Sequence, residues 1–467
     1  MNIKLIFYYL RWFFIPLATG SFFVICFSYL ENNNDEIFSY LVVFLLSISL
    51  FFICSFFKED KYINKINLQL LILIGWLVLP IFISIPYFLS YYNLDLFSSY
   101  YESVSGFLSF GFSIFISPDQ LDKSLLLWRS LSQWLGGFYY LFTIVAILST
   151  TDINFIPHKY ISASDNSLNF ENKFLKNFIN IFYCYLLLSL IILFLLNFTN
   201  FNFFEKLNLM MTIVSSGGFY IEDKLSVFDI VDSLIISACF LLSALNIFIF
   251  YEIFKFSKNY NFKEDLNVIF VVLLISFLLL ALFSKTDNFH EIFLMITTSI
   301  STSGIPLFIS PNPLLINFFI ILTFVGGCLY STGSGFKFLR ILFFGKKFLM
   351  EIIKLLNPSI IIKKNIFNSN VSIKNSDYYI ASLMFLFYLA IFFVAVLFIS
   401  FENITFENAY KLVFLTLNNT NPKNYFSNNI DFYDLDYFSH VVIIFLLFMS
   451  KVYFVSFLVI IKKILWR

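Results

Sequence analysis

Long apolar runs recur from one end of this chain to the other, and they restrict its fold more than any other feature. Runs of about 18 or more apolar residues match the length that a helix needs to cross a bilayer. The sequence is 60% hydrophobic and only 13% charged, which exceeds what a soluble fold of this length needs. The runs therefore predict an all-α polytopic membrane protein surrounded by the lipid bilayer.

Charge in the loops predicts how the spans are oriented. About 22 of the 30 Lys and Arg residues fall in loops on one side of the predicted bilayer, together with both ends of the chain. Because cytoplasmic loops are enriched in Lys and Arg, this side is expected to be cytoplasmic. About 19 of the 29 acids fall on the other side, so the outer face would concentrate cations at an entrance. A net charge of only +1 gives no electrostatic footprint for nucleic acid.

A repeated unit follows two leading spans, which lie at roughly 8–30 and 37–57. Each unit has a full span, a short amphipathic segment and a return span. The four copies lie at roughly 68–91, 97–117 and 124–149; 175–199, 203–221 and 227–254; 266–284, 288–309 and 313–344; and 377–400, 404–425 and 437–463. The short segments do not suffice to cross a bilayer, so they are expected to be re-entrant. The predicted divisions of the chain are 1–66, 67–150, 151–255, 256–345 and 346–467.

Each short segment ends in small polar residues, usually with glycine. Such a string after a short helix can turn backbone carbonyls inward to replace the water shell of a cation. Glycines that pack membrane helices together are the ordinary alternative, but four strings at the same place in four repeats favour a selectivity filter. The candidate residues for binding the ion through backbone carbonyls are Ser109, Phe110, Gly111, Ser215, Ser216, Gly217, Gly218, Thr302, Ser303, Gly304, Asn419, Thr420 and Asn421.

Three longer strings carry a family resemblance. They are E-S-V-S-G-F-L-S-F-G from Glu102 to Gly111, W-R-S-L-S-Q-W-L-G-G from Trp128 to Gly137, and G-G-C-L-Y-S-T-G-S-G-F-K from Gly326 to Lys337. Together they resemble signatures of the Trk/Ktr/HKT superfamily of potassium transporters, and the two leading spans are similar to its bacterial Trk branch. The resemblance implies four helix–pore loop–helix units around one central pore, with K⁺ as the transported ion and no cofactor in this chain.

The same resemblance implies roles for individual residues. Filter glycines correspond to Gly111, Gly217 and Gly304, and a basic residue in the ion path of the last helix corresponds to Lys451. The family pattern has an acid shortly after that basic residue, where this chain has Tyr453. A gate beneath the filter corresponds to the glycine-rich stretch, and its candidate residues are Gly326, Gly327, Ser331, Thr332, Gly333 and Gly335.

Partners and location are implied in the same way. The resemblance implies a homodimer in the bacterial inner membrane, seated on a TrkA-like cytoplasmic regulatory ring that binds nucleotide. The basic segment that holds Lys346, Lys347, Lys354, Lys363 and Lys364 is the candidate docking surface for that ring. Ordinary enrichment of positive charge on the cytoplasmic side explains the segment equally well.

Asn421 departs from the family, which has glycine at this place in the fourth loop. Asparagine is the residue other than glycine that best tolerates a positive φ, so the expectation is that the carbonyl ring survives here. If the ring is distorted instead, the chain would be a sodium-permeable or weakly selective transporter. Two alternatives lie outside ion selectivity: a membrane enzyme that uses Asp434 and Asp436, and a scaffold that transports nothing.

Overall fold

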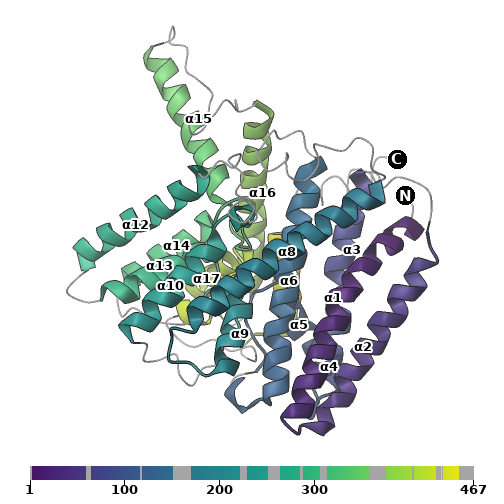
Figure 1. Cartoon of the computed structure of the whole chain (residues 1–467). Coiled ribbons are helices and arrows are strands. Elements are labelled where there is room, and N and C mark those ends of the chain that lie inside the picture. The colour runs from purple at the N-terminus through teal and green to yellow at the C-terminus, as the bar shows by residue number, and fades with distance from the viewer. Residues whose placement is uncertain are drawn as a thin grey trace.

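The computed structural model describes residues 3–58, 65–115, 118–150, 170–220, 229–250, 263–283, 288–305, 313–357, 375–401, 404–426, 433 and 435–451. All longer regular elements within these ranges are α-helices, shown in Figure 1. Their bounds are α1 Ile3–Leu30, α2 Asn34–Ser55, α3 Lys65–Ile83, α4 Ile85–Leu89, α5 Leu96–Phe107, α6 Lys123–Thr150, α8 Phe170–Leu196, α9 Phe203–Val214, α10 Ile230–Ala244, α12 Lys263–Phe283, α13 Phe289–Ser301, α14 Pro313–Val325, α15 Phe338–Leu356, α16 Asn375–Ser400, α17 Phe406–Leu417 and α18 Tyr437–Lys451.

Six stretches of the described helices are long and apolar enough to cross a bilayer. They are Ile3–Leu30, Glu36–Ser55, Ile66–Leu89, Phe174–Leu196, Lys263–Leu282 and Ala381–Ser400. Several of these helices leave large apolar side chains exposed while polar residues of the bundle interior are buried. This reversal of the usual pattern fits a molecule whose outer surface meets lipid. The predicted all-α polytopic fold is confirmed.

Four short helices, α5, α9, α13 and α17, interrupt the series of long ones. Each has 12 or 13 residues, a length of about 18 Å that does not cross a hydrocarbon core of about 30 Å. Each begins at a polar N-cap residue that satisfies backbone N–H groups of the first turn. These caps are Asp95, Asn202, Asn288 and Thr405. The same start and the same length in all four units agree with the predicted repeat.

The predicted return span of the second unit differs from the structure. The sequence suggests a continuous return span at 227–254, but α10 ends at Ala244. The backbone turns there because the carbonyl of Ala244 accepts a hydrogen bond from the N–H of Cys328, at 2.8 Å, from another unit. The N–H of Asn246 is likewise held by the carboxylate of Asp265, at 2.9 Å. A long-range contact therefore ends a helix that periodicity alone would extend.

The outer elements of the bundle differ in how they are packed. Helices α1 and α2 lie side by side at one edge, and α15 projects away from the other helices, as Figure 1 shows. The second half of α15 is exposed, including Phe348, Leu355 and Leu356. The four short helices lie inside, so that their C-terminal ends meet in the interior.

Candidate functional site

The four short helices end in the same backbone turn. One residue just beyond each helix has a positive φ of 53–62°. It is the second residue beyond α5, α9 and α17 and the first beyond α13, and these residues are Ser109, Ser216, Asn419 and Thr302. The next N–H in each loop donates back to a carbonyl five residues earlier, at 2.8–3.1 Å. This is the Schellman type of helix ending, which satisfies carbonyls that the helix leaves unpaired. Four segments far apart in the sequence thus share one conformation, and the turn fixes their structural register.

This register defines two layers of the site. The inner ring consists of the positive-φ residues Ser109, Ser216, Thr302 and Asn419. The outer ring lies two residues further along each loop and consists of Gly111, Gly218, Gly304 and Asn421. All eight residues are buried. Between the rings lie the buried residues Phe110, Gly217, Ser303 and Thr420.

The outer ring brings the four loops into direct contact. A Cβ atom added to Gly111 would overlap the backbone of Gly218. A Cβ on Gly304 would lie 2.5 Å from the backbone nitrogen of Asn421, and Gly304 has a φ of +63°. Glycine is required at these positions both for close approach and, in Gly304, for the left-handed backbone. The predicted filter residues of all four units are therefore gathered in one place.

The two adjacent glycines of the second loop, Gly217 and Gly218, have different neighbours. Gly218 is equivalent to Gly111 and Gly304, whereas the resemblance had pointed to Gly217. A Cβ on Gly217 would instead overlap the side-chain amide of Gln133. With its amide oriented by its neighbours, Gln133 accepts hydrogen bonds from the N–H groups of Phe219, at 3.0 Å, and Gly218, at 3.2 Å. Gln133 thereby holds the second loop by its backbone.

The fourth loop uses its asparagines differently from what the sequence suggests. The positive φ lies at Asn419, and Asn421 is outside the left-handed region. The side chain of Asn419 donates to the carbonyls of Leu108, at 2.7 Å, and Ser109, at 3.1 Å. The side chain of Asn421 donates to the carbonyls of Gly111 and Gly218. Expecting Asn421 to replace glycine through its tolerance of positive φ was therefore wrong.

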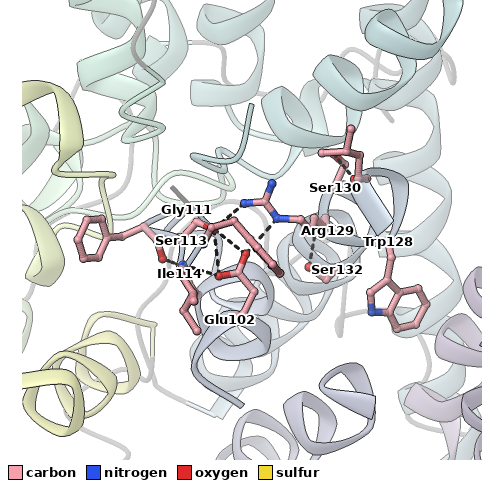
Figure 2. Close-up of polar contacts among 12 residues, drawn as sticks. Glu102, Gly111, Ser113, Ile114, Trp128, Arg129, Ser130 and Ser132 are labelled. Carbon is pink, nitrogen blue, oxygen red and sulfur yellow. Dashed lines mark hydrogen bonds and ion pairs between the residues drawn. The ribbon is translucent and has the colours of Figure 1, made fainter. Parts of the chain in front are cut away.

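A buried ion pair braces the first loop against the return helix α6. Arg129 is 2% and Glu102 0% exposed in their side chains, and Arg129 Nε lies 3.0 Å from Glu102 Oε1. Figure 2 shows both side chains converging on the irregular segment that follows Gly111, where Ser113 and the N–H of Ile114 donate to Glu102. The guanidinium also stacks over the ring of Phe219, 4.1 Å from its centroid. One arginine thus ties together the first and second loops.

The glycine-rich stretch forms a closed loop between α14 and α15. We call residues 326–337 the inner loop. Its two ends meet, because the N–H of Phe336 donates to the carbonyl of Phe324 at 2.9 Å and their rings stack with centroids 5.3 Å apart. Gly326 and Gly335 have positive φ angles of 63° and 75° and approach each other closely. The glycine-rich stretch, which the sequence places within a return span at 313–344, is therefore a folded insertion between two helices.

The tip of the inner loop contacts the inner ring directly. The hydroxyls of Thr332 and Ser216 are 3.0 Å apart, and the N–H of Ser334 donates to the hydroxyl of Thr302 at 2.7 Å. Gly333 is close enough to Ser301 that a Cβ would lie 2.8 Å from its carbonyl oxygen. The tip of the inner loop therefore lies directly against one side of the inner ring.

Two lysines approach the inner loop from different elements. Lys337 ends the loop, and its amine donates to the carbonyls of Ser331, at 3.1 Å, and Gly333. Lys451, at the end of α18, has its amine 4.2 Å from the centroid of the Tyr140 ring, with no hydrogen-bond partner within the described residues. The amine of Lys337 lies 5.5 Å from the same ring. Both lysines are 1% exposed.

The base of the inner loop is held by an acidic pair that the sequence analysis did not identify. Glu264 accepts from the N–H of Leu329 at 2.9 Å, and Asp265 accepts from the thiol of Cys328 at 3.3 Å. Their signal in the sequence is an exception to the charge pattern, because two adjacent acids begin a span on the side where bases dominate. Lys337, Arg129 and Gln133 stand within the strings that carried the resemblance, but no role was assigned to them there.

Some predicted residues do not join the site. Ser215 lies at the end of α9 and its hydroxyl bonds to carbonyls of its own helix, at 2.9 and 3.0 Å. Asp434, Lys363, Lys364 and Tyr453 lie outside the described residues, so the hypotheses that involve them stay predictions. Asp436 is exposed on the loop before α18.

Comparison with known proteins gives relatives at low identity. No family model matches the chain. It is 24% identical over 287 residues to an uncharacterized cation transporter of Methanocaldococcus jannaschii. The aligned residues make up 61% of this chain and 60% of that protein. It is 24% identical over 366 residues to the Trk system potassium uptake protein TrkH of Halomonas elongata, covering 74% and 75%. The TrkH of Escherichia coli is 26% identical over 327 residues, covering 65% and 66%.

A solved structure shows the same fold. The crystal structure of the potassium transporter TrkH from Vibrio parahaemolyticus superposes with a TM-score of 0.84, with 20% sequence identity and complete coverage of both chains. The helical bundle with its four short helices is thus an arrangement already seen in a membrane transporter.

Proposed function

Because the chain is similar to the Trk-type potassium-transporter membrane subunits, in sequence and in fold, we propose that it carries monovalent cations, with K⁺ as the preferred ion, into the cell. The observation that carries this proposal is the turn repeated in all four loops, which brings Gly111, Gly218, Gly304 and Asn421 together. A ring of uncharged backbone oxygens suits a dehydrated monovalent cation, because carbonyls replace its water without binding it too tightly to leave.

The path runs from the outer ring to the inner ring and then to the inner loop. Ions enter by the outer ring, shed water against backbone carbonyls and leave past Ser216 and Thr302. There the inner loop closes the way, since Thr332 and Ser334 are hydrogen-bonded to those two residues. Conduction therefore requires the inner loop to move. The membrane potential supplies about 2.3 kcal/mol per charge per 100 mV for the passage.

The lysines beneath the filter act on this gate in two ways. Lys337 keeps the inner loop folded by bonding to its carbonyls. Lys451 places a second amine beside Tyr140, and a positive charge at membrane depth repels a passing cation. We assign Lys337 to holding the loop and Lys451 to raising the electrostatic barrier.

The proposed assembly follows from the relatives named Trk system proteins. We propose a homodimer in the bacterial inner membrane, with a cytoplasmic nucleotide-binding subunit as regulator and both chain ends on the cytoplasmic side. Helix α15 supports this assembly, because it projects from the bundle and presents Lys346, Lys347 and Lys354. The inner loop ends where α15 begins, so a partner that moves α15 would pull on the gate.

A weakly selective transporter is the second candidate. Asn421 favours it, because its side chain breaks the fourfold equivalence of the outer ring. The two candidates differ in their preference for K⁺ over Na⁺, and both place the ion in the same ring.

The proposal is tested by adding a side chain to the outer ring. Gly304→Ser places a Cβ against the backbone of Asn421 in a left-handed conformation, so it should displace carbonyls and lower K⁺ over Na⁺ preference in proteoliposome uptake by about ten-fold or more. Gly345→Ser is the matched control, because a Cβ there has no atom within 4 Å. If Gly304→Ser keeps both the selectivity and the rate of the unmodified protein, the filter assignment is wrong.

A further inference from the structure

The side chain of Asn421 occupies the ligand positions of the outer ring. Its Nδ2 donates to the carbonyl oxygen of Gly111 at 2.9 Å and to that of Gly218 at 3.1 Å. These oxygens belong to two other loops, both at positions equivalent to Asn421 itself. An NH₂ group that satisfies two inward carbonyls supplies the partial positive charge that a dehydrated cation would otherwise supply.

The orientation of this amide is fixed by its contacts. The Oδ1 atom of Asn421 accepts a hydrogen bond from the N–H of Lys423 at 3.1 Å. Reversing the amide would place an oxygen against two carbonyl oxygens and an NH₂ against a donor, so only the observed orientation satisfies both ends. Asn421 is 2% exposed. The amide is therefore held in the ring by three hydrogen bonds, and two of them use the proposed ion ligands.

A small cavity lies beside the amide of Asn421, and the side chain can rotate into it. The cavity has a volume of about 20 Å³, and its lining includes Gly111, Phe112, Gly218, Asn421 and Lys423. A volume of this size holds about one water molecule. The amide is neutral and turns about two side-chain bonds, so it can leave the carbonyls without carrying a buried charge with it.

We propose that the side chain of Asn421 is a tethered competitor of the transported cation, which must displace the amide from Gly111 and Gly218 before it binds in the outer ring. This rests on the proposed function and adds a residue that sets the affinity of the filter. The cation concentration then decides which group occupies the outer ring. At low concentration the amide of Asn421 occupies it, and at high concentration the ion does.

The first variants remove the donor. Asn421→Gly deletes the competing group, and Asn421→Ala, which is also uncharged, likewise has no N–H to offer the carbonyls. Purified proteins would be titrated with K⁺ at constant ionic strength, balanced by N-methylglucamine, and followed by thermal unfolding, because a bound ion stabilises the folded state. The K⁺ concentration that gives half of the stabilisation should be about ten-fold lower in both variants than in the unmodified protein.

A matched control separates this effect from a general effect of glycine. Asn93→Gly makes the same exchange at an exposed residue with a φ of 45°, a conformation that glycine accepts, on the loop before α5. Its half-stabilising K⁺ concentration should equal that of the unmodified protein. If Asn421→Gly fails to fold, Asn421→Ala still decides, because the two variants change the backbone differently and remove the same donor.

The outcomes distinguish this inference from the proposed function. Rb⁺ uptake that K⁺ suppresses, together with equal half-stabilising K⁺ concentrations in the unmodified protein and the Asn421 variants, would overturn the competitor and leave the transporter standing. The absence of both uptake and K⁺-dependent stabilisation from every protein would overturn both. A lower half-stabilising concentration in both Asn421 variants, with Asn93→Gly unchanged, is the result that the competitor predicts.

Discussion

Lys451 is buried at a depth where removing an ammonium group from water costs much free energy. Its side chain is 1% exposed, and within the described residues its amine contacts the face of Tyr140 without a hydrogen bond. A cation–π contact offsets only part of the cost of removing an ammonium from water. A residue kept at such a cost is a functional candidate, and its nearness to Lys337 through Tyr140 places it at the proposed gate.

Removing this charge should open the path partly. Lys451→Ala is expected to raise basal cation uptake about ten-fold, which corresponds to a barrier lower by about 1.4 kcal/mol, because repulsion of the passing ion is lost. Uptake of Rb⁺ into proteoliposomes measures this. Lys354→Ala is the control, since Lys354 lies on exposed α15 in a solvated pair with Glu351. Uptake at or below the unmodified level in Lys451→Ala would argue against a blocking role.

Residue types in the sequence indicated some residues of this site and missed others. The polar strings that end the short segments pointed to Gly111 and Gly304, and the glycine-rich stretch pointed to the inner loop; the structure places all of them at or beside the two rings. The strings did not separate Gly217 from Gly218, since the difference depends on Gln133 approaching from α6. Asn421 was recognised as an exception, but its hydrogen bonds to two other loops depend on tertiary structure.

Among the elements, α6 holds the first two loops in position. Its Arg129 pairs with Glu102 on α5 and stacks on Phe219, while its Gln133 binds the backbone of the second loop. These contacts lie immediately outside the two rings. The outer ring is therefore rigid where α6 supports it, which a carbonyl filter needs in order to keep its ligands at fixed distances.

Breaking the buried ion pair of Arg129 and Glu102 should lower the stability of the folded protein far more than breaking an exposed ion pair does. Glu102→Gln leaves the Arg129 charge buried without its carboxylate, at a cost of about 3–5 kcal/mol of stability. It should also lower uptake, because Glu102 binds the N–H of Ile114 beyond the outer ring. Thermal unfolding in detergent measures the first effect.

The comparison for that variant is Lys123→Ala. Lys123 and Glu31 form a pair of similar length, 2.9 Å, but their side chains are 56% and 36% exposed. Such a pair contributes about 0–1 kcal/mol, so the unfolding temperature should change little. Equal losses in the two variants would show that Arg129 and Glu102 do not brace the loops.

Elements were predicted well where local chemistry decides them. Short amphipathic segments that do not suffice to cross a bilayer located the four short helices in the sequence. The end of α10 at Ala244 was not predictable, because its cause is the inner loop, which lies more than 80 residues away. The glycine-rich stretch was singled out in the sequence as a candidate gate, but the closure of the inner loop through Phe324 and Phe336 requires two rings to meet in space.

On the scale of the whole molecule, four units act as one ring. The repeat was visible in the sequence as an alternation of long and short apolar segments. The structure adds that the turns after the four short helices share one backbone conformation. What the sequence did not show is how the symmetry is broken. The inner loop closes on the second and third loops, and the Asn421 side chain reaches the first and second.

The central claim is that this bundle passes monovalent cations through the four-loop ring. The most direct measurement is tracer uptake into proteoliposomes of the purified chain, Rb⁺ against Na⁺, at a fixed inside-negative potential. Conduction through this ring predicts Rb⁺ uptake that rises with the potential and that K⁺ suppresses more strongly than Na⁺ does. Absence of uptake for both ions, in a preparation that is folded and also supplied with candidate regulators and nucleotide, would contradict it.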